Sequence, residues 1–253
     1  MIKIFLSVVI PCYNEERNLR LGALENVVSF LAKQKYIWEV ILVDDGSSDE
    51  SPKLLRKFIK ENKRFRLIVN KHQGKAAAVT SGVLASHGEI ILFSDLDQAT
   101  PLSEIERLIP FFNKGYDLVI GSRNSRRRGA PFLRLAMAKG FMSLRNLILN
   151  LGIKDTQCGF KAFRRNAALK IFPHLQVFNH RRVASGSTVT AGFDIEVLYL
   201  AKLAGFRIAE VPVEWHYQET RNVNPIKDSL ESLFDLIKIK QHSLSGKYQQ
   251  ILT

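Results

Sequence analysis

Short apolar runs alternate with longer amphipathic stretches along the chain up to residue 98. The runs are rich in Val, Ile and Leu, and they lie at 6–10, 39–43, 65–69 and 89–93. Between them, 16–33 and 52–62 have the length and the period of helices. Repeated strand–helix–strand units are typical of a parallel sheet with helices on both faces. The pattern therefore predicts an α/β fold with a mostly parallel central sheet.

Two prolines mark predicted helix starts. Ser51 precedes Pro52, and Thr100 precedes Pro101. A hydroxyl side chain is a favoured N-cap, and proline is favoured in the first helical turn. We therefore expect both hydroxyls to cap the helices that follow them.

The pattern loosens after Pro101 but still alternates. It predicts a helix at 102–113, a strand at 116–122 and a long helix from 131 to about 150. A loop, a strand, a helix and a strand follow between 155 and 215, and the polar segment 178–191 is predicted to be a loop.

The chain is predicted to end in a one-sided helix that begins at Pro225. Its apolar residues recur at helical spacing, and we expect them to dock on the core rather than insert into a membrane: Leu230, Leu233, Phe234 and Ile237. The tryptophans, Trp38 and Trp215, are expected either in the core or at the edge of a ligand site, with the core preferred.

Charge changes this picture more than composition does. A hydrophobic content of 46% in 253 residues is ordinary for a globular protein, but a formal charge of +13 is not. It predicts attraction to a polyanion such as nucleic acid, an anionic membrane or a phosphorylated substrate.

Only two cysteines, Cys12 and Cys158, are present, which favours a reducing compartment. No apolar window approaches the roughly 18 to 20 residues of a membrane span, so membrane contact is expected to be peripheral.

Acidic residues follow three of the predicted strands. Glu15 comes after the first, Asp44 and Asp45 end the second, and Asp95 and Asp97 follow the fourth. The carboxyl ends of parallel strands meet at one end of the sheet, where ligands bind. Neighbouring carboxylates disfavour each other's ionisation, and a divalent cation that prefers oxygen ligands, Mg²⁺ or Mn²⁺, removes that repulsion. Asp95 and Asp97 therefore predict a metal clamp.

The sequence lacks the glycine loops that hold phosphate in many nucleotide-binding proteins. No Gly-x-Gly-x-x-Gly follows a strand, and "HQGKAAA" at 72–78 has only the Gly-Lys of a Walker loop. A metal between carboxylates and a diphosphate needs no such loop, and it neutralises the diphosphate as a leaving group. The chemistry predicted is group transfer from a nucleoside diphosphate.

Several segments resemble a known family. "SVVIPCYNEE", "VILVDDGSSD", "GKAAAVTSG" and "ILFSDLDQATP" are similar, in order and spacing, to the family-2 glycosyltransferases with the Rossmann-like GT-A fold. "VIGSR", "DTQCGFKAF", "FDIEVLYLA" and "IAEVPVEW" resemble the branch that includes dolichyl-phosphate glucosyltransferases and polyprenyl-phosphate sugar synthases. The resemblance extends to about Lys247. It implies a single domain with a donor-binding half at 1–98, an acceptor-binding half at 99–220 and a C-terminal helical tail at 221–253.

The resemblance also implies donor-site residues. The nucleoside is bordered by a set from the first two strands, with Asp44 beside it: Pro11, Tyr13, Glu15 and Asp45. Asp95 contacts the ribose or diphosphate and shares the metal with Asp97. Relatives often carry a further ligand, Gln, two residues after the second Asp, whereas this chain has Ala99 there and Gln98 before it. Lys75 either touches the diphosphate or opens a helix.

Three basic residues are the implied acceptor-phosphate contacts: Arg123, Arg134 and Lys139. Guanidinium groups suit phosphate oxygens, and an acceptor lipid phosphate on an anionic leaflet would also explain the excess charge. The arginines at 126–128 either join them or form a solvated loop. Members of the branch often carry a membrane anchor before the first strand, where this chain begins, so we expect a cytoplasmic protein held peripherally at the cytoplasmic face of a membrane.

The implied reaction is a single in-line displacement that inverts the sugar. The acceptor phosphate is already ionised near neutral pH, so a strong base is not obligatory. Asp155 is the first candidate for orienting or deprotonating the acceptor and Asp194 the second, and either could instead be a capping carboxylate. The histidines show no metal-ligand spacing, so surface or packing roles are expected for them.

Other functions remain open at this point. A phosphohydrolase of the haloacid-dehalogenase type also uses Asp-x-Asp after a strand, but it normally has Thr or Val where this chain has Ala99. A nucleic-acid-binding module would interleave its arginines with aromatic residues, which this chain does not do, so no nucleic-acid partner is expected. Within the family, the motifs favour UDP-glucose as donor over GDP-mannose, and a soluble glycan is the alternative acceptor.

Overall fold

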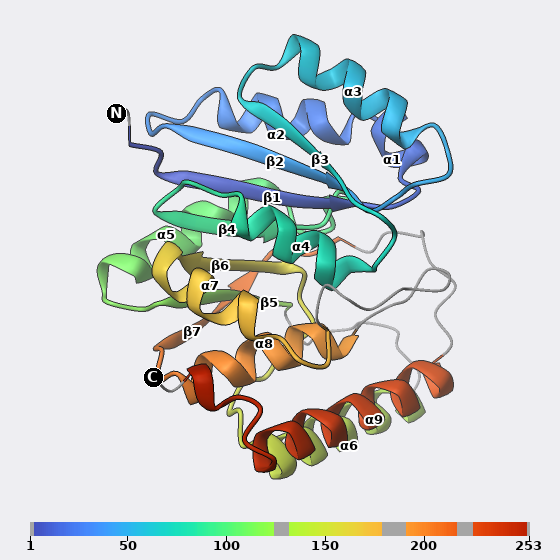
Figure 1. The fold of residues 1–253 in the computed structure, drawn as a ribbon, viewed down its shortest axis with the longest axis vertical. Coiled ribbons are helices and arrows are strands. Elements are labelled where there is room, and N and C mark those ends of the chain that lie inside the picture. The colour runs from blue at the N-terminus through green and yellow to red at the C-terminus, as the bar shows by residue number, and fades with distance from the viewer. Residues whose placement is uncertain (1–2, 124–131, 179–190, 217–224, 252–253) are drawn as a thin grey trace.

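The structure, a computed structural model, describes residues 3–123, 132–178, 191–216 and 225–251. At 132–139, 141, 191 and 225–231 it describes the backbone alone. Seven strands form one sheet in the order β3-β2-β1-β4-β6-β5-β7 (Figure 1). Their bounds are β1 Leu6–Cys12, β2 Trp38–Asp44, β3 Phe65–Val69, β4 Ile90–Ser94, β5 Leu118–Arg123, β6 Phe160–Arg164 and β7 Ile208–Val213.

The sheet is mostly parallel, as the pattern predicts. Only β6 among these strands runs against its neighbours, and it pairs with β4 on one side and β5 on the other. The carboxyl ends of the other six strands therefore lie at one end of the sheet, hereafter the carboxyl end, and so does the segment that leads into β6. The sheet is continuous across residue 98, and the division there into two halves stays a prediction.

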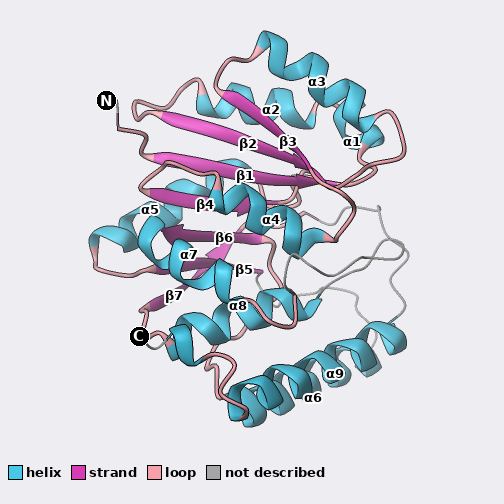
Figure 2. Cartoon of the chain, viewed as in Figure 1, coloured by secondary structure: helices cyan, strands magenta, loops and turns pink. Residues whose placement is uncertain are grey.

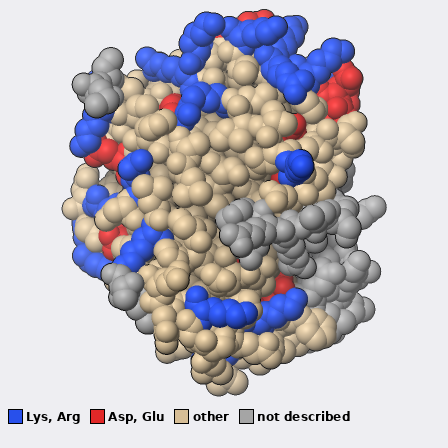
Figure 3. Space-filling view, in the orientation of Figure 1, with Lys and Arg blue, Asp and Glu red and all other residues tan. Residues whose placement is uncertain are grey.

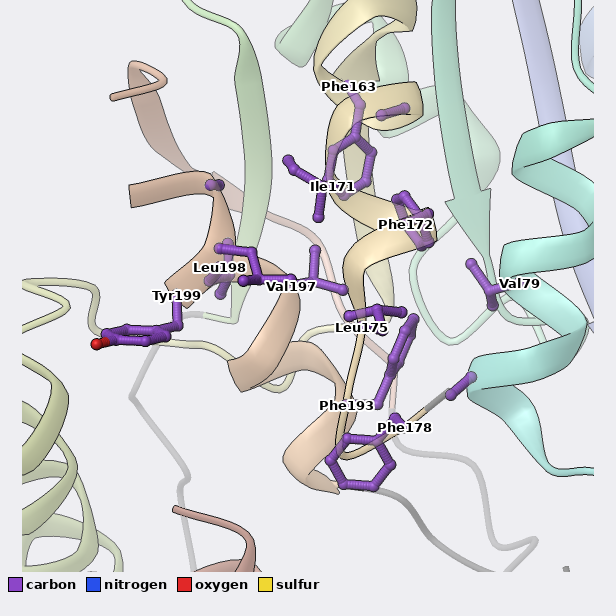
Figure 4. Close-up of a cluster of buried hydrophobic side chains, with 14 of the residues drawn as sticks. Val79, Phe163, Ile171, Phe172, Leu175, Phe178, Phe193, Val197, Leu198 and Tyr199 are labelled. Carbon is purple, nitrogen blue, oxygen red and sulfur yellow. The ribbon is translucent and has the colours of Figure 1, made fainter. Parts of the chain in front are cut away.

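Each central strand is buried on both faces, which explains its continuous apolar sequence. Successive side chains point to opposite faces. Val9, Ile41 and Phe93 thus belong to one hydrophobic cluster, while Val8 and Leu42 belong to the other. Figure 4 shows part of the first cluster, in which Phe163, Phe172 and Phe193 pack together with residues of α7 and α8. The α/β prediction, with helices on both faces of the sheet, is confirmed.

The helices agree with the prediction except in three places. Their bounds are α1 Glu16–Arg20, α2 Ala23–Leu31, α3 Ser51–Glu61, α4 Lys75–Leu84, η1 Leu102–Glu104, α5 Ile105–Asn113, α6 Phe132–Leu149, α7 Arg165–Ile171, η2 Phe172–His174, α8 Ala191–Leu203, α9 Pro225–Leu244 and η3 Gln249–Ile251. The helix predicted at 16–33 is broken at Gly22, whose φ of 81° is left-handed. The one at 102–113 opens with the 3₁₀ turn η1, and α7 was not predicted.

Both predicted caps are wrong, because tertiary contacts take the hydroxyls. Ser51 lies inside α3, and its Oγ accepts a hydrogen bond of 2.8 Å from the backbone N–H of Glu15. Thr100 makes no side-chain cap at the start of η1, and its Oγ1 lies 4.0 Å from the Sγ of Cys158. Ser51 thus ties α3 to the turn after β1 instead of closing its own helix.

The helix α9 docks on the core, but not through the whole predicted face. Phe234 and Ile237 are 59% and 41% exposed, Leu233 is half-buried, and the side chain of Leu230 is not among those described. Between residues 232 and 244, the buried side chains of α9 are Ser232, Leu236 and Ile239. The loop predicted at 178–191 lies almost wholly outside the described residues. In the part of the chain that is described, no helix combines the length and the hydrophobicity that a membrane span requires. Figure 2 shows α6 and α9 side by side below α8, away from the sheet.

Candidate active site

The predicted acidic residues do meet at the carboxyl end of the sheet. Asp44 closes β2, Asp45 follows it, and the N–H of Asp45 donates a 2.9 Å bond to the carbonyl of Cys12 at the end of β1. Asp95 and Asp97 follow β4, which is the other neighbour of β1. The parallel register of three adjacent strands therefore places these residues at the same end of the sheet.

Asp45 organises the turn that leads into α4. Its carboxylate accepts hydrogen bonds from the backbone N–H groups of Gln73 (3.1 Å) and Gly74 (2.7 Å) and lies 2.9 Å from Nδ1 of His72. Burial raises the pKa of Asp45, and these bonds offset that rise only in part. The carboxylate is thus held by a fixed set of donors rather than exposed to water.

His72 is a site residue that the sequence analysis missed. Its ring stacks on the ring of Tyr13, with centroids 4.0 Å apart and planes inclined by 10°. Together with the contact to Asp45, this fixes the Tyr13 ring beside the predicted nucleoside position. The one signal in the sequence was the location of His72 shortly after the third strand, at the same end as the acidic residues.

Three other predicted donor residues serve the local structure. Pro11 pairs with Val43 within the sheet. The Glu15 carboxylate accepts a 2.6 Å bond from Nδ2 of Asn18, one turn further on. Asp44 is buried, and its Oδ1 accepts a 3.1 Å bond from the N–H of Ser47. The nucleoside contacts of these residues stay predictions.

Lys75 and Asp95 form an ion pair at the carboxyl end. The Nζ of Lys75 lies 2.6 Å from Oδ1 of Asp95, and Lys75 is also the first residue of α4. Both readings of Lys75, as a helix opener and as a residue of the site, are thus compatible with its position. Asp95 lies against Gly159, where an added Cβ would come within 2.1 Å of Oδ2. Gly159 is therefore a further candidate site residue, since any larger residue there would force this carboxylate to shift.

The residues present fit a divalent cation. Asp95 and Asp97 offer hard oxygen ligands, and the Lys75 ammonium already places a cation against Asp95. Oδ1 of Asp97 accepts a 3.0 Å bond from the N–H of Ala99, while the Gln98 amide turns back to the Asp95 carbonyl. Within the described residues no group of three His, Cys, Asp or Glu side chains could hold a metal ion. The chain thus offers two carboxylates, and other ligands would come from a bound molecule or water.

Arg123 and Asp155 form a close pair where β5 ends. The backbone N–H and Nε of Arg123 lie 2.9 and 2.7 Å from Oδ2 of Asp155, and NH2 lies 2.8 Å from Oδ1. Burial would raise the pKa of Asp155, but the hydrogen bonds and charge of Arg123 outweigh it and lower that pKa. A carboxylate with a lowered pKa is a weak base, so this geometry suits orientation of Arg123 better than proton removal.

Glu210 and Trp215 complete the surroundings of this pair. Glu210 Oε1 accepts bonds from Ser122 Oγ (2.8 Å) and from the N–H of Asp155 (2.7 Å). The guanidinium carbon of Arg123 lies 5.7 Å from the ring centroid of Trp215, which is 41% exposed. Of the two predicted positions, the preferred one in the core is thus wrong for Trp215, whereas Trp38 is buried. Neither contact could be predicted from spacing, because the partners come from separate strands.

Asp194, the second catalytic candidate, neutralises a buried lysine. Lys161 is fully buried in β6, and its Nζ lies 2.6 Å from Oδ1 of Asp194 in the first turn of α8. The Nζ also lies 5.3 Å from the ring centroid of Phe93, the ring that the Lys75 Nζ approaches at 6.0 Å.

The remaining basic candidates cannot be placed by their side chains. Arg134 and Lys139 lie on α6 at positions where the structure describes only the backbone, and 126–128 lie outside the described residues.

Comparison with known proteins agrees with this geometry. Residues 7–172 match the family model described as Glycosyl transferase family 2. The chain is 36% identical to dolichyl-phosphate beta-glucosyltransferase of Saccharomyces cerevisiae, over 98% of this chain and 77% of that protein. It is 33% identical to the human protein of the same name, over 96% of this chain and 77% of that protein.

The fold is also found among solved structures. Glucosyl-3-phosphoglycerate synthase from Mycobacterium tuberculosis, in complex with Mn²⁺, UDP and glucosyl-3-phosphoglycerate, superposes with a TM-score of 0.61 at 17% identity. The match covers 94% of this chain and 80% of that one. At this identity the likeness concerns the fold alone. The sequence matches go further: the chain belongs to glycosyltransferase family 2.

Proposed function

We propose that this protein is an inverting hexosyltransferase that moves glucose from UDP-glucose to dolichyl phosphate. The observation that carries the proposal is the grouping of Asp45, Lys75 and Asp95 beside the Arg123–Asp155 pair at one end of the sheet. One group suits a nucleoside diphosphate and the other an acceptor phosphate. The relatives named dolichyl-phosphate beta-glucosyltransferase, similar over nearly the whole chain, support this choice of sugar and acceptor.

The donor half would bind UDP-glucose through residues of β1, β2 and the turn before α4. Tyr13, fixed by His72, offers its ring to the base. Asp45 holds the main chain from which Lys75 reaches the diphosphate. Asp95 and Asp97 would hold a divalent cation, Mg²⁺ or Mn²⁺, which when bound neutralises charge on the leaving diphosphate. The Mn²⁺ and UDP in the M. tuberculosis structure, which shares the fold, support this expectation.

The acceptor half would place the lipid phosphate against Arg123, with Arg134 and Lys139 as further contacts. Asp155 holds the Arg123 guanidinium through two of its nitrogens and so presents the remaining donors in a fixed direction. An acceptor phosphate oxygen forms the new bond to the anomeric carbon while the bond from that carbon to the UDP oxygen breaks, with inversion. The electron pair leaves with UDP, and Asp155 need not take a proton.

The outer helices support a peripheral position on a membrane. Large apolar side chains are exposed along both: Leu144 and Leu147 on α6, and Phe234, Ile237 and Leu244 on α9. Lys238 and Lys240 lie on the same part of α9, and basic side chains cross the lower part of Figure 3, where Figure 1 places α8 and α9. Apolar side chains flanked by lysines suit the boundary of an anionic leaflet, and the reducing cytoplasm suits the two free cysteines.

A transfer assay tests the function. Purified protein, MgCl₂ or MnCl₂, dolichyl phosphate and radiolabelled UDP-glucose are mixed, and the products are partitioned between butanol and water. We expect label in the butanol phase, its loss in Asp97→Asn, and its retention in Asp117→Asn, which lies at the opposite end of β5. Label that enters butanol from GDP-mannose instead, or that reaches only soluble glycans, would overturn the proposal.

A further inference from the structure

Lys75 is held at both ends. Its main chain follows Gly74, whose φ of 92° is left-handed and whose N–H donates a 2.7 Å bond to Asp45. Its Nζ lies 2.6 Å from Asp95 and 6.0 Å from the ring centroid of Phe93. A lysine usually moves freely in solvent, but here the turn fixes the start of the side chain and a carboxylate fixes its head. The ammonium group therefore has a defined position against Asp95.

Asp95 has little freedom to leave that position. Gly159 packs so closely that a single added carbon atom would overlap Oδ2 of Asp95. The carboxylate is thus confined between the backbone at Gly159 on one side and Lys75 on the other. Any cation that binds Asp95 has to approach the oxygen already paired with Lys75, or share the carboxylate with it.

We propose that the Lys75 ammonium occupies the cation position on Asp95 until the donor arrives, so that metal and nucleoside diphosphate bind as a pair. This inference rests on the proposed function, because it takes a nucleoside diphosphate as the ligand. A divalent cation arriving alone is repelled by the ammonium a few ångströms away. A diphosphate arriving alone meets the negative charges of Asp95 and Asp97. When both arrive, the diphosphate becomes the new partner of Lys75 and the metal becomes the new partner of Asp95.

The exchange replaces one ion pair, Lys75–Asp95, by two, Lys75–diphosphate and metal–Asp95, which is why it favours joint binding. Thermodynamic linkage then requires that the nucleotide strengthens metal binding by the same factor as the metal strengthens nucleotide binding. Part of that coupling factor comes from the positive charge of Lys75. If the positive charge at position 75 is removed, the metal alone binds more tightly and the nucleotide alone binds more weakly. The coupling factor between the two ligands becomes smaller.

The test measures binding rather than transfer. Free Mn²⁺ is followed by its electron paramagnetic resonance signal in titrations of wild type, Lys75→Met and Lys75→Arg, each with and without UDP. Methionine keeps most of the side-chain length without the charge, and arginine keeps the charge. Without UDP, we expect Lys75→Met to bind Mn²⁺ about tenfold more tightly than wild type, within the usual range of such couplings. Lys75→Arg should resemble wild type.

Lys71→Met is the matched control, because Lys71 is an exposed lysine four residues before Lys75 in the same turn. It should leave Mn²⁺ binding within about twofold of wild type, as expected for an exposed charge screened by solvent. Circular dichroism and thermal unfolding verify that each variant is folded. The inference is overturned if folded Lys75→Met binds Mn²⁺ no more tightly than wild type, or if Lys75→Arg behaves like Lys75→Met. If UDP strengthens Mn²⁺ binding in none of the proteins, the proposed UDP-sugar donor is wrong. The titrations without UDP still decide the role of Lys75 in that case.

Discussion

The two sides of the candidate active site handle charge in opposite ways. On the donor side, Asp95 pairs with Lys75, whereas Asp44, Asp45 and Asp97 accept hydrogen bonds from backbone N–H groups. On the acceptor side, two carboxylates are each paired with a cation: Asp155 with Arg123, and Asp194 with Lys161. The donor side thus holds its carboxylates mainly through backbone N–H groups, whereas the acceptor side holds two of its carboxylates through ion pairs.

This difference indicates what each side contributes. Two carboxylates as close in sequence as Asp95 and Asp97 favour a ligand that brings positive charge, so they indicate a site completed by binding. Balanced pairs at Arg123 and Lys161 indicate a site already organised before binding. In such a site the carboxylates orient the cations, and the cations contact the substrate or support the backbone.

The largest expected effect breaks the balance on the acceptor side. Asp194→Ala leaves the fully buried Lys161 without its carboxylate and should lower the free energy of unfolding by about 3–5 kcal/mol. Urea denaturation measures this. The double variant Lys161→Met/Asp194→Leu should recover most of the loss, because an apolar pair of similar volume needs no compensation. If Asp194→Ala unfolds at the same midpoint urea concentration as wild type, the ion pair contributes little to stability.

The next effect concerns the donor side and should spare stability. Gly159→Ala places a Cβ within 2.1 Å of Oδ2 of Asp95, so the carboxylate must move. Displacement of a ligand-holding group by about 1 Å can cost about 100-fold in rate. We expect glucose transfer to fall by about that factor, with metal-dependent UDP binding weakened in parallel.

Gly140→Ala is the control for this prediction. Nothing lies within 4 Å of the added carbon at Gly140, which is on α6. It should leave transfer unchanged and stabilise the helix slightly. If Gly159→Ala transfers glucose at the wild-type rate, the position of Asp95 does not limit the reaction.

How much of this could be predicted from sequence also differs between the two sides. Asp45 and Asp95 directly follow predicted strands, so strand order alone brings them together. The partners of Arg123 and Asp194 cannot be inferred in this way, because Asp155 and Lys161 lie 32 and 33 residues away and meet them only through the antiparallel strand β6. The cap predicted at Ser51 was wrong for a similar reason, since a tertiary partner, the N–H of Glu15, binds its hydroxyl.

The orientation of α9 could not be predicted from periodicity at all. The helix has two partly apolar stripes, and hydrophobic spacing alone does not show which one meets α8 and the core. The structure buries Leu236 and Ile239 and leaves Phe234 and Ile237 exposed. A hydrogen bond of 2.7 Å between Tyr199 and Ser243 helps to fix that choice, and it involves a polar residue that a hydrophobic pattern ignores.

A pH series sharpens the comparison for Asp155. Its folded pKa is lowered, because the contacts with Arg123 outweigh burial, so it stabilises the fold above its unfolded pKa of about 3.9. That stability is lost as the pH falls through the folded pKa. Asp155→Asn should therefore be about 2 kcal/mol less stable than wild type at neutral pH, and the gap should narrow below about pH 4. Urea unfolding from pH 7 to pH 3 measures the gap, and a gap independent of pH would contradict the assigned ionisation.

The smallest effect concerns the surface next to the acceptor side. If α6 and α9 rest on a leaflet, Phe234→Ser should weaken binding to vesicles that contain anionic lipid by about tenfold, because a fully buried Phe contributes about 1.5–3 kcal/mol and a helix at the interface buries only part of that area. Stability should hardly change, since Phe234 is 59% exposed in the protein. Leu21→Ser, at an exposed apolar residue between α1 and α2, is the matched control and should bind vesicles like wild type. Vesicle co-sedimentation separates the outcomes. If both variants lose vesicle binding equally, the binding is a non-specific effect of exposed apolar residues. If Phe234→Ser alone loses vesicle binding, α9 faces the lipid, and so does the acceptor side of the site next to it.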